Sequence, residues 1–492
     1  MTDVAEEQGA GSFDRCQRHA WTGVTVVLAK LMSIVSQIVL GYLLSVETYA
    51  VFAAATAALA FVSGFQNSGV GKVLVQRQAE YDSIAADLTG FAIYLGAAGA
   101  FVLILIAIGI SAGYEMPVLL PILAISAITI PFISVNSVYT AKQSVALNFK
   151  SISFYSTLYT AIYYVFLLLA ASLGAEGFSI ALATLFAAVI MHIVYIRQIG
   201  LLTVNLTFSS SSFWSVFGAL KWTMLSSYIF GFTQSGDYLV LGRLFDKQEL
   251  GYYYFGFMLT ANIGLLLSLA ISQTLMPVFS KIKDDSLRLK RAFMKASETI
   301  AFLSSLICLG IVAVVPEAVH FLWAGKWDPS IFVAVAMAFT FPLRVLASMA
   351  AVALEARGRW RQRTMLLLYD ALGIMIFAGV GGWWGGLTGA AVAVALHRGI
   401  TGLLAFPVAM RALDFRYHEV GNYFLQSCMP FFPIAAFVIG FKQWLGPVQG
   451  GVQQVLSAAG IAGAAAAVFV GVTFLTNRKV LGYFVPAINR RA

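Results

Sequence analysis

Three basic residues lie near the middle of long apolar segments of this sequence: Lys30, Arg344 and Arg398. A charged side chain at the centre of a membrane-spanning helix costs about 2.5 to 3.5 kcal/mol on insertion scales, so such residues are functional candidates. Arginine can bind a compact anion through two parallel hydrogen bonds, whereas lysine supplies a point charge. We therefore expect these cations to face either an anionic ligand in a wet cavity or an acid on a neighbouring helix.

Five other ionisable residues of the apolar segments are further candidates. Asp237 and Asp370 are deep enough to pair with a cavity cation or to take up a coupling proton. His397 adjoins one of the central arginines and could titrate near neutral pH, although a single histidine in a span is more commonly a packing residue. Lys72 and Lys221 are weaker binding candidates, because they lie near the ends of their segments and their amines can reach the headgroup region.

The composition places these residues in a membrane protein. Of the 492 residues, 60% are hydrophobic and only 11% are charged, which leaves too few polar groups to cover a soluble surface of that size. Because a span needs roughly 20 apolar residues, the hydrophobic runs predict an all-α integral membrane protein with about fourteen transmembrane helices. We expect the spans at residues 20–44, 49–74, 89–112, 116–139, 151–172, 177–198, 215–242, 250–275, 298–322, 331–354, 364–386, 388–411, 424–445 and 452–475.

The basic residues predict which side of the membrane each loop faces. Of the 31 Lys and Arg residues, 22 fall in every second loop or tail, three in the intervening loops and six inside the spans. Cytoplasmic loops carry the Lys and Arg excess, so both termini are expected in the cytoplasm. The net charge of +9 is spread over many loops, which favours anionic lipid headgroups over nucleic acid as its partner.

The chain also contains similar segments that lie six expected spans apart. Gly41–Phe52 aligns without gaps on Gly242–Tyr253, and Pro131 matches Pro342. The offset of the two prolines also aligns residues 147–150 with 358–361. Because six is even, the two halves would insert the same way up, as parallel repeats with a cavity between them. We expect a cytosolic tail at 1–19, six-helix lobes at 20–206 and 207–412, a helix pair at 413–475 and a second cytosolic tail at 476–492.

Four segments resemble the polysaccharide-transporter (Wzx-type) flippases of the multidrug/oligosaccharidyl-lipid/polysaccharide exporter superfamily. They are Gly41–Phe52, Asn67–Gln76, Gly236–Tyr252 and Gly325–Trp327, and they occur in order along the first twelve expected spans. The resemblance implies a multi-pass carrier in a bacterial inner membrane. Its implied substrate is a polyprenyl-diphosphate-linked oligosaccharide, moved from the cytoplasmic to the outer leaflet for exopolysaccharide, O-antigen or capsule synthesis. It also implies the polymerase and the chain-length or export proteins of that pathway as partners.

This resemblance gives the central cations a ligand, since a diphosphate is a compact multiple anion. We expect Lys30, Arg344 and Arg398 to bind it during alternating access between the lobes. A peptidoglycan-precursor flippase of the same superfamily also handles a diphosphate and stays an alternative. A multidrug exporter for organic cations is the other, although its cavity would be expected to present acids and aromatics.

An enzyme, such as a membrane polymerase or ligase, is the less favoured alternative. The best polar cluster surrounds one expected outer loop and contains Glu317, His320, Trp323, Lys326 and Asp328. It has neither metal-ligand spacing nor paired carboxylates in register, and the three cysteines form no CxxC motif. We therefore expect no catalytic residues, no metal and no cofactor.

Tyrosines form two further patterns. Tyr155, Tyr159 and Tyr163 recur on one face of the fifth span, where a packing seam is favoured over a sugar-stacking surface. Tyr252, Tyr253 and Tyr254 open the eighth span and predict an anchor at the outer headgroups.

Overall fold

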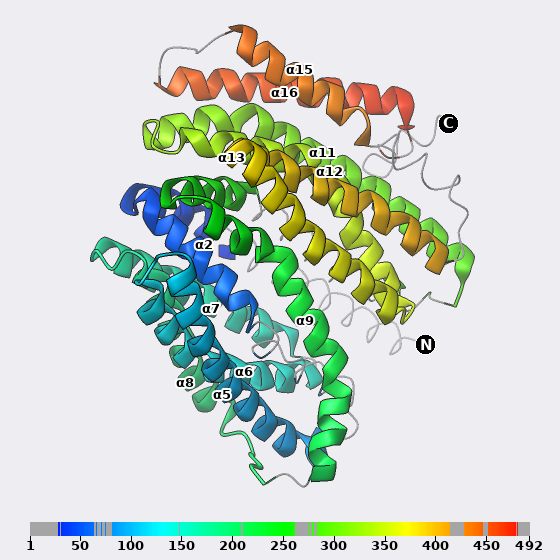
Figure 1. Cartoon of the computed structure of the whole chain (residues 1–492). Coiled ribbons are helices and arrows are strands. Elements are labelled where there is room, and N and C mark those ends of the chain that lie inside the picture. The colour runs from blue at the N-terminus through cyan, green and yellow to red at the C-terminus, as the bar shows by residue number, and fades with distance from the viewer. Residues whose placement is uncertain are drawn as a thin grey trace, which may run out of the picture. The chain divides into compact units, whose positions relative to one another are not determined.

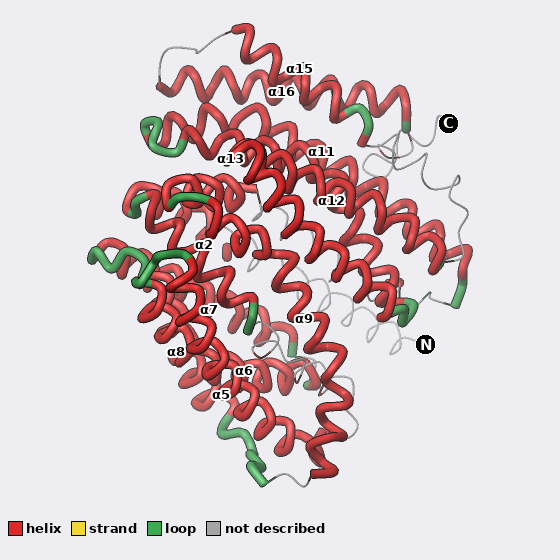
Figure 2. Tube along the Cα trace, in the orientation of Figure 1, coloured by secondary structure: helices red, strands yellow, loops and turns green. Residues whose placement is uncertain are grey.

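The structure is a computed structural model of the whole chain. It describes residues 28–29, 31–62, 65, 70, 74, 81–146, 148–207, 210–260, 275, 278–279, 282, 284–413, 428–445, 451–478 and 480. These residues form helices joined by loops, with no strand among them (Figure 2). Eight of their helices are long and apolar enough to cross a membrane. The all-α membrane fold expected from the sequence is thereby confirmed, while the total of fourteen spans stays a prediction.

The chain divides into two compact units, residues 1–235 and 236–492. The lobe and tail boundaries expected from the sequence stay a prediction. In the N-terminal unit, α2 packs on α5 and α6, α5 packs on α6, and α6 and α7 both pack on α8 (Figure 1). Its described helices are Leu31–Leu43, α2 (Val46–Ala60), α5 (Tyr81–Gly113), α6 (Leu119–Val145), α7 (Phe149–Ser172), α8 (Phe178–Ile199) and the first part of α9 (Ser210–Leu244).

In the C-terminal unit, α12 packs between α11 and α13, and α15 and α16 lie along α11 (Figure 1). Its described helices are the end of α9, residues 247–260, α11 (Ser286–Trp323), α12 (Asp328–Ala356), α13 (Trp360–Ala412), α15 (Phe431–Leu445) and α16 (Gly451–Thr476). Gly385 and Gly386 have non-helical backbone angles, and the φ of Gly386 is +55°. They divide α13 into two helices, as the expected spans 364–386 and 388–411 require.

Several helix boundaries repeat at the same offset as the two prolines. Pro131 lies inside α6 and Pro342 inside α12, a separation of 211 residues. The ends of these helices, Val145 and Ala356, and the starts of α7 and α13, Phe149 and Trp360, are separated by the same 211 residues. The two prolines and the helix boundaries that follow them therefore repeat with one common offset.

Two helices begin earlier than the hydrophobic runs predict. The span expected at 89–112 lies in α5, which starts at Tyr81, and the span expected at 298–322 lies in α11, which starts at Ser286. The Asp285 carboxylate accepts a hydrogen bond from the Arg288 amide at 3.0 Å and caps α11. A polar cap sets where a helix begins, whereas hydropathy reports only where it enters lipid.

The second helix of α13 approaches α12 closely at a glycine. A Cβ built on Gly402 would lie 2.0 Å from the Leu343 carbonyl oxygen and 3.1 Å from the Arg344 Cα. Small residues permit such backbone approach between membrane helices. The crossing therefore fixes the position of Arg344 relative to the helix that carries Arg398.

At the other end of this unit, an aromatic stack closes the loop between α11 and α12. The buried Trp327 ring stacks on Phe255 with centroids 3.9 Å apart, and Trp323 meets Phe255 edge-on. Lys442 of α15 pairs with Glu317 of α11 and donates a hydrogen bond to the Ala313 carbonyl at 2.8 Å. Aromatic packing and a half-buried ion pair thus tie four helical segments together.

Gly402→Ala tests the close crossing. The added methyl group has no room beside the Leu343 carbonyl oxygen, so the variant should lose about 1 to 3 kcal/mol of stability, as over-packed sites do. Thermal unfolding of the purified protein in detergent measures this loss.

Gly399→Ala is the matched control one turn away. Its new Cβ would meet its nearest neighbours at 3.5 Å, an ordinary contact, and alanine favours a helix over glycine by about 1 kcal/mol. This variant should be as stable as the parent or more so. Equal unfolding temperatures for the two variants would contradict the close approach.

Candidate functional site

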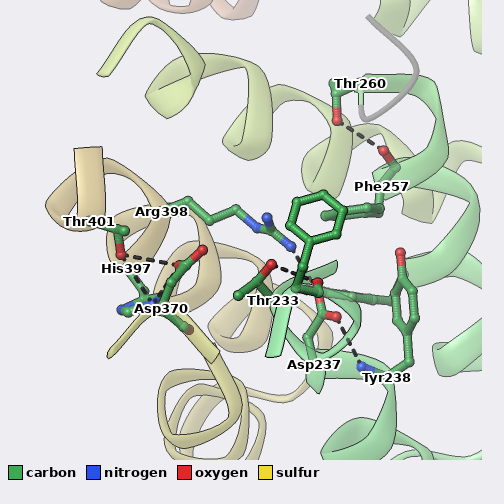
Figure 3. A network of polar contacts seen from close by, with 11 residues as sticks. Thr233, Asp237, Tyr238, Phe257, Thr260, Asp370, His397, Arg398 and Thr401 are labelled. Carbon is green, nitrogen blue, oxygen red and sulfur yellow. Dashed lines mark hydrogen bonds and ion pairs between the residues drawn. The ribbon is translucent and has the colours of Figure 1, made fainter. Parts of the chain in front are cut away.

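Ionisable residues from separate helices meet inside the C-terminal unit. Asp237 lies on α9, Arg344 on α12, Asp370 on the first helix of α13, and His397 and Arg398 on the second. Figure 3 shows the Arg398 guanidinium directed toward Asp237, with Asp370, His397 and Thr401 grouped beside it. Such residues are rare in membrane helices and normally face one another or a polar cavity.

Asp237 and Arg398 form a buried ion pair. Arg398 Nη2 lies 3.7 Å from Asp237 Oδ2, and the two residues are 2% and 0% exposed, respectively. The Tyr253 hydroxyl donates to Asp237 Oδ2 at 3.0 Å, and the Tyr238 amide donates to Oδ1 at 3.1 Å. Two hydrogen bonds and a cation stabilise the ionised carboxylate. The geometry matches the ion-pair alternative for Arg398.

The hydrogen-bonding capacity of Arg398 is unused within the described part of the chain. Its Nε, Nη1 and Nη2 atoms are buried and have no hydrogen-bond acceptor among the described residues. The guanidinium carbon lies 4.9 Å from the centre of the Phe257 ring, a cation–π contact (Figure 3). A guanidinium carries five N–H donors, and buried donors without acceptors are costly. Such a group suits an anion that can accept several hydrogen bonds.

Arg344 adds a second cation to the same region. It is half-buried on α12, and its charge interacts with those of Arg398, Asp237 and Asp370. The Gly402 crossing holds the two arginine-bearing helices close together. Because the two guanidinium groups repel one another, a multiple anion that contacts both would lower their electrostatic energy.

Asp370, His397 and Thr401 form a second polar group. His397 Nε2 lies 3.2 Å from Asp370 Oδ1 and 3.1 Å from the Asp370 carbonyl oxygen, and the Thr401 hydroxyl donates to Oδ1 at 3.2 Å. The His397 ring fits only because residue 373 is a glycine: a Cβ there would lie 2.1 Å from His397 Cε1. This packing holds the imidazole against the carboxylate of the neighbouring helix.

Five of the residues expected from the sequence are thus brought together: Asp237, Arg344, Asp370, His397 and Arg398. Lys30 and Lys72 lie outside the described residues, and so does the side chain of Lys221. The structure adds Tyr253, which the sequence placed at the outer headgroups. That expectation is wrong, because Tyr253 is fully buried and binds Asp237. A buried acid such as Asp237 requires a hydrogen-bond donor, and this requirement was the signal that could have identified Tyr253.

The other sequence patterns have structural roles. Tyr155 and Tyr159 pack against a buried cluster around Tyr139 and Tyr195, which supports the packing seam. The residues of the outer polar cluster also contact structural partners. Glu317 pairs with Lys442, His320 with Asp328 at 2.8 Å, Trp323 with Phe255, and Lys326 with the Trp327 ring at 5.3 Å.

Comparison with known proteins agrees with this architecture. A family model described as polysaccharide biosynthesis protein matches residues 39–332. The teichuronic acid biosynthesis protein TuaB of Bacillus subtilis (strain 168) is 24% identical over 209 residues, which cover 41% of this chain and 41% of that protein. The chain therefore matches less than half the length of this curated relative.

Two solved transporters share the fold. The lipid II flippase MurJ, in its inward closed conformation, superimposes with a TM-score of 0.72 at 14% identity, covering 92% of this chain and 98% of its own. An inward-facing MATE-family multidrug resistance transporter gives 0.61 at 13% identity, covering 78% and 94%. With more than half of its length matched by the family model, the chain belongs to the polysaccharide biosynthesis protein family, on the fold of the multidrug/oligosaccharidyl-lipid/polysaccharide exporter superfamily.

Proposed function

We propose that this protein moves a polyprenyl-diphosphate-linked oligosaccharide from the cytoplasmic to the outer leaflet of a bacterial inner membrane, with both of its termini in the cytoplasm. The observation that carries the proposal is Arg398, a buried guanidinium whose nitrogens lack hydrogen-bond acceptors among the described residues. Arg344 interacts with it electrostatically from the neighbouring helix. Family membership and the flippase fold support the same function.

The diphosphate is the part of the substrate that suits these residues. Guanidinium groups bind phosphate oxygens through paired, charge-assisted hydrogen bonds. In the structure, Asp237 balances the charge of Arg398 at 3.7 Å without a hydrogen bond to it. In our proposal the diphosphate replaces Asp237 as the principal counter-ion of Arg398, with Arg344 as the second cation of the site.

The acids give the site a way to release its ligand. Asp237 and Asp370 lie within the electrostatic reach of both arginines, so they compete with the diphosphate for the same cations. A transport site must bind its substrate and then let it leave. We assign Asp237, Asp370 and His397 to this competition and to coupling, and Lys72 and Lys221 to the first attraction of the headgroup near the membrane surface.

Alternating access completes the proposed cycle. The headgroup and sugars enter a cationic cavity while the prenyl tail stays in lipid, and rocking of one six-helix lobe against the other exposes them to the outer side. The polymerase and the chain-length or export proteins of the pathway would receive the flipped unit. The members of the outer polar cluster form the ion pairs and ring contacts that close this end of the unit.

A double substitution separates binding from stability. Arg398→Gln leaves Asp237 buried without its cation and should cost about 3 to 5 kcal/mol, as broken buried pairs do. Adding Asp237→Asn removes the orphaned charge, so the double variant should recover most of that stability. Export should nevertheless stay abolished, because the guanidinium that binds the diphosphate is gone. Thermal unfolding and polymer export measure the two effects.

Asp237→Asn alone is the matched single variant, since it keeps Arg398 and removes only the competing charge. Restored export in the stable double variant would show that Arg398 serves structure and not substrate, and would overturn the proposed site.

Arg344→Ala tests the second cation. This variant should insert normally and lose polymer export, and cells should accumulate the lipid-linked oligosaccharide in the cytoplasmic leaflet. A membrane-impermeant glycosidase or lectin applied to oriented vesicles reports the leaflet. Arg359→Ala is the control, because Arg359 is an exposed residue of the loop between α12 and α13. Accumulation of the unit in the outer leaflet would instead indicate a defect after translocation.

A further inference from the structure

We propose that His192, in the N-terminal unit, is a proton-binding site whose basic atom is Nε2. The observation is a polar chain between two helices. Asn136 Nδ2 of α6 donates to the Ala188 carbonyl of α8 at 3.0 Å, and Asn136 Oδ1 lies 2.9 Å from His192 Nδ1. A half-buried histidine with a fixed partner inside a membrane helix is a functional candidate by default.

This row of hydrogen bonds determines which nitrogen of His192 carries the proton. A carbonyl oxygen only accepts hydrogen bonds, so the Asn136 amide must turn its NH2 group toward Ala188 and its oxygen toward His192. An amide oxygen also only accepts, and the Nδ1 of His192 must therefore donate. In the neutral imidazole the proton is then on Nδ1, which leaves Nε2 as the basic nitrogen.

The surroundings of the ring leave His192 without a charged partner among its described contacts. Phe132 and Tyr139 of α6 meet the ring edge-on, with centroids 5.6 and 5.9 Å away. The titratable groups of the surrounding cluster are tyrosines: Tyr139 of α6, Tyr155 and Tyr159 of α7, and Tyr195 of α8. The charged groups of these helices on this side are cations nearer the helix ends, Lys142, Lys150 and Arg197.

His192 also lies near one end of its helix. It lies seven residues before Ile199, the last residue of α8, a distance of about 10 Å at 1.5 Å per residue. By the charge pattern, this end faces the cytosol. His397 differs, because it is fully buried and its Nε2 lies against Asp370. His320 differs because its Nδ1 pairs with Asp328. His192 therefore combines a defined tautomer with a position near one end of its helix.

The proton-binding site is inferred from the structure alone, whereas its consequence for transport rests on the proposed function. A proton on Nε2 would create a cation within the span, and the free energy of that cation depends on its exposure to water. Any rearrangement of the helices that changes this exposure is then linked to proton uptake or release. We expect His192 to make the transport cycle depend on pH.

Labelling with diethyl pyrocarbonate tests the site on the purified full-length protein, without substrate. The reagent acylates neutral imidazole, so the rate at His192, followed by peptide mass spectrometry, should fall up to tenfold per pH unit below the titration midpoint. Asn136→Asp places a carboxylate against Nδ1–H and should raise that midpoint by about one pH unit or more. Asn136→Leu is the matched control of similar size, with no charge. His397 should stay unreactive throughout.

A His192 that is as unreactive as His397, or a midpoint that does not change in Asn136→Asp, would overturn the site. For the functional consequence, the pH profile of polymer export by His192→Gln should differ from that of the parent, while His320→Gln should keep the parent profile. An unchanged pH profile in His192→Gln would overturn the link to transport. The labelling result is independent of export, so failure of the proposed function and failure of this site are distinguishable.

Discussion

The buried ion pair between Asp237 and Arg398 is the constraint on which the C-terminal unit depends. Each charge alone would make its helix costly to bury in an apolar bundle, and the opposite charge on another helix offsets part of that cost. Tyr253 and Phe257 complete the arrangement, one by hydrogen bonding the carboxylate and the other by covering the guanidinium. The packing of three helical segments thus follows from one electrostatic requirement.

Close backbone contacts supply the rigid part of the same site. Gly402 brings α12 against the second helix of α13, and Gly373 leaves room for the His397 ring. At both positions a single methyl group would collide with its neighbour. The backbone therefore fixes the positions from which the charged side chains extend. In the proposed function, this frame would hold the two arginines in place while the diphosphate binds and leaves.

Local signals in the sequence predicted much of the fold. The span expected at 177–198 appears as Phe178–Ile199, and the one expected at 452–475 as Gly451–Thr476. Hydropathy did not predict where α5 and α11 begin, because their first turns are polar and a cap such as Asp285 decides the start. The two matched prolines predicted the 211-residue offset that also separates the ends of α6 and α12 and the starts of α7 and α13.

The sequence by itself determined that apolar helices would form and that Asp237, Arg344, Asp370, His397 and Arg398 would lie deep within them, because partition into lipid is decided by some 20 neighbouring residues. Only the tertiary structure decided which charges meet. Asp237 and Arg398 are far apart along the chain, and Tyr253 carries no depth signal that distinguishes it from Tyr252 or Tyr254. Ion pairing falls off steeply with distance, so it is decided by helix crossings such as that at Gly402, which no local pattern encodes.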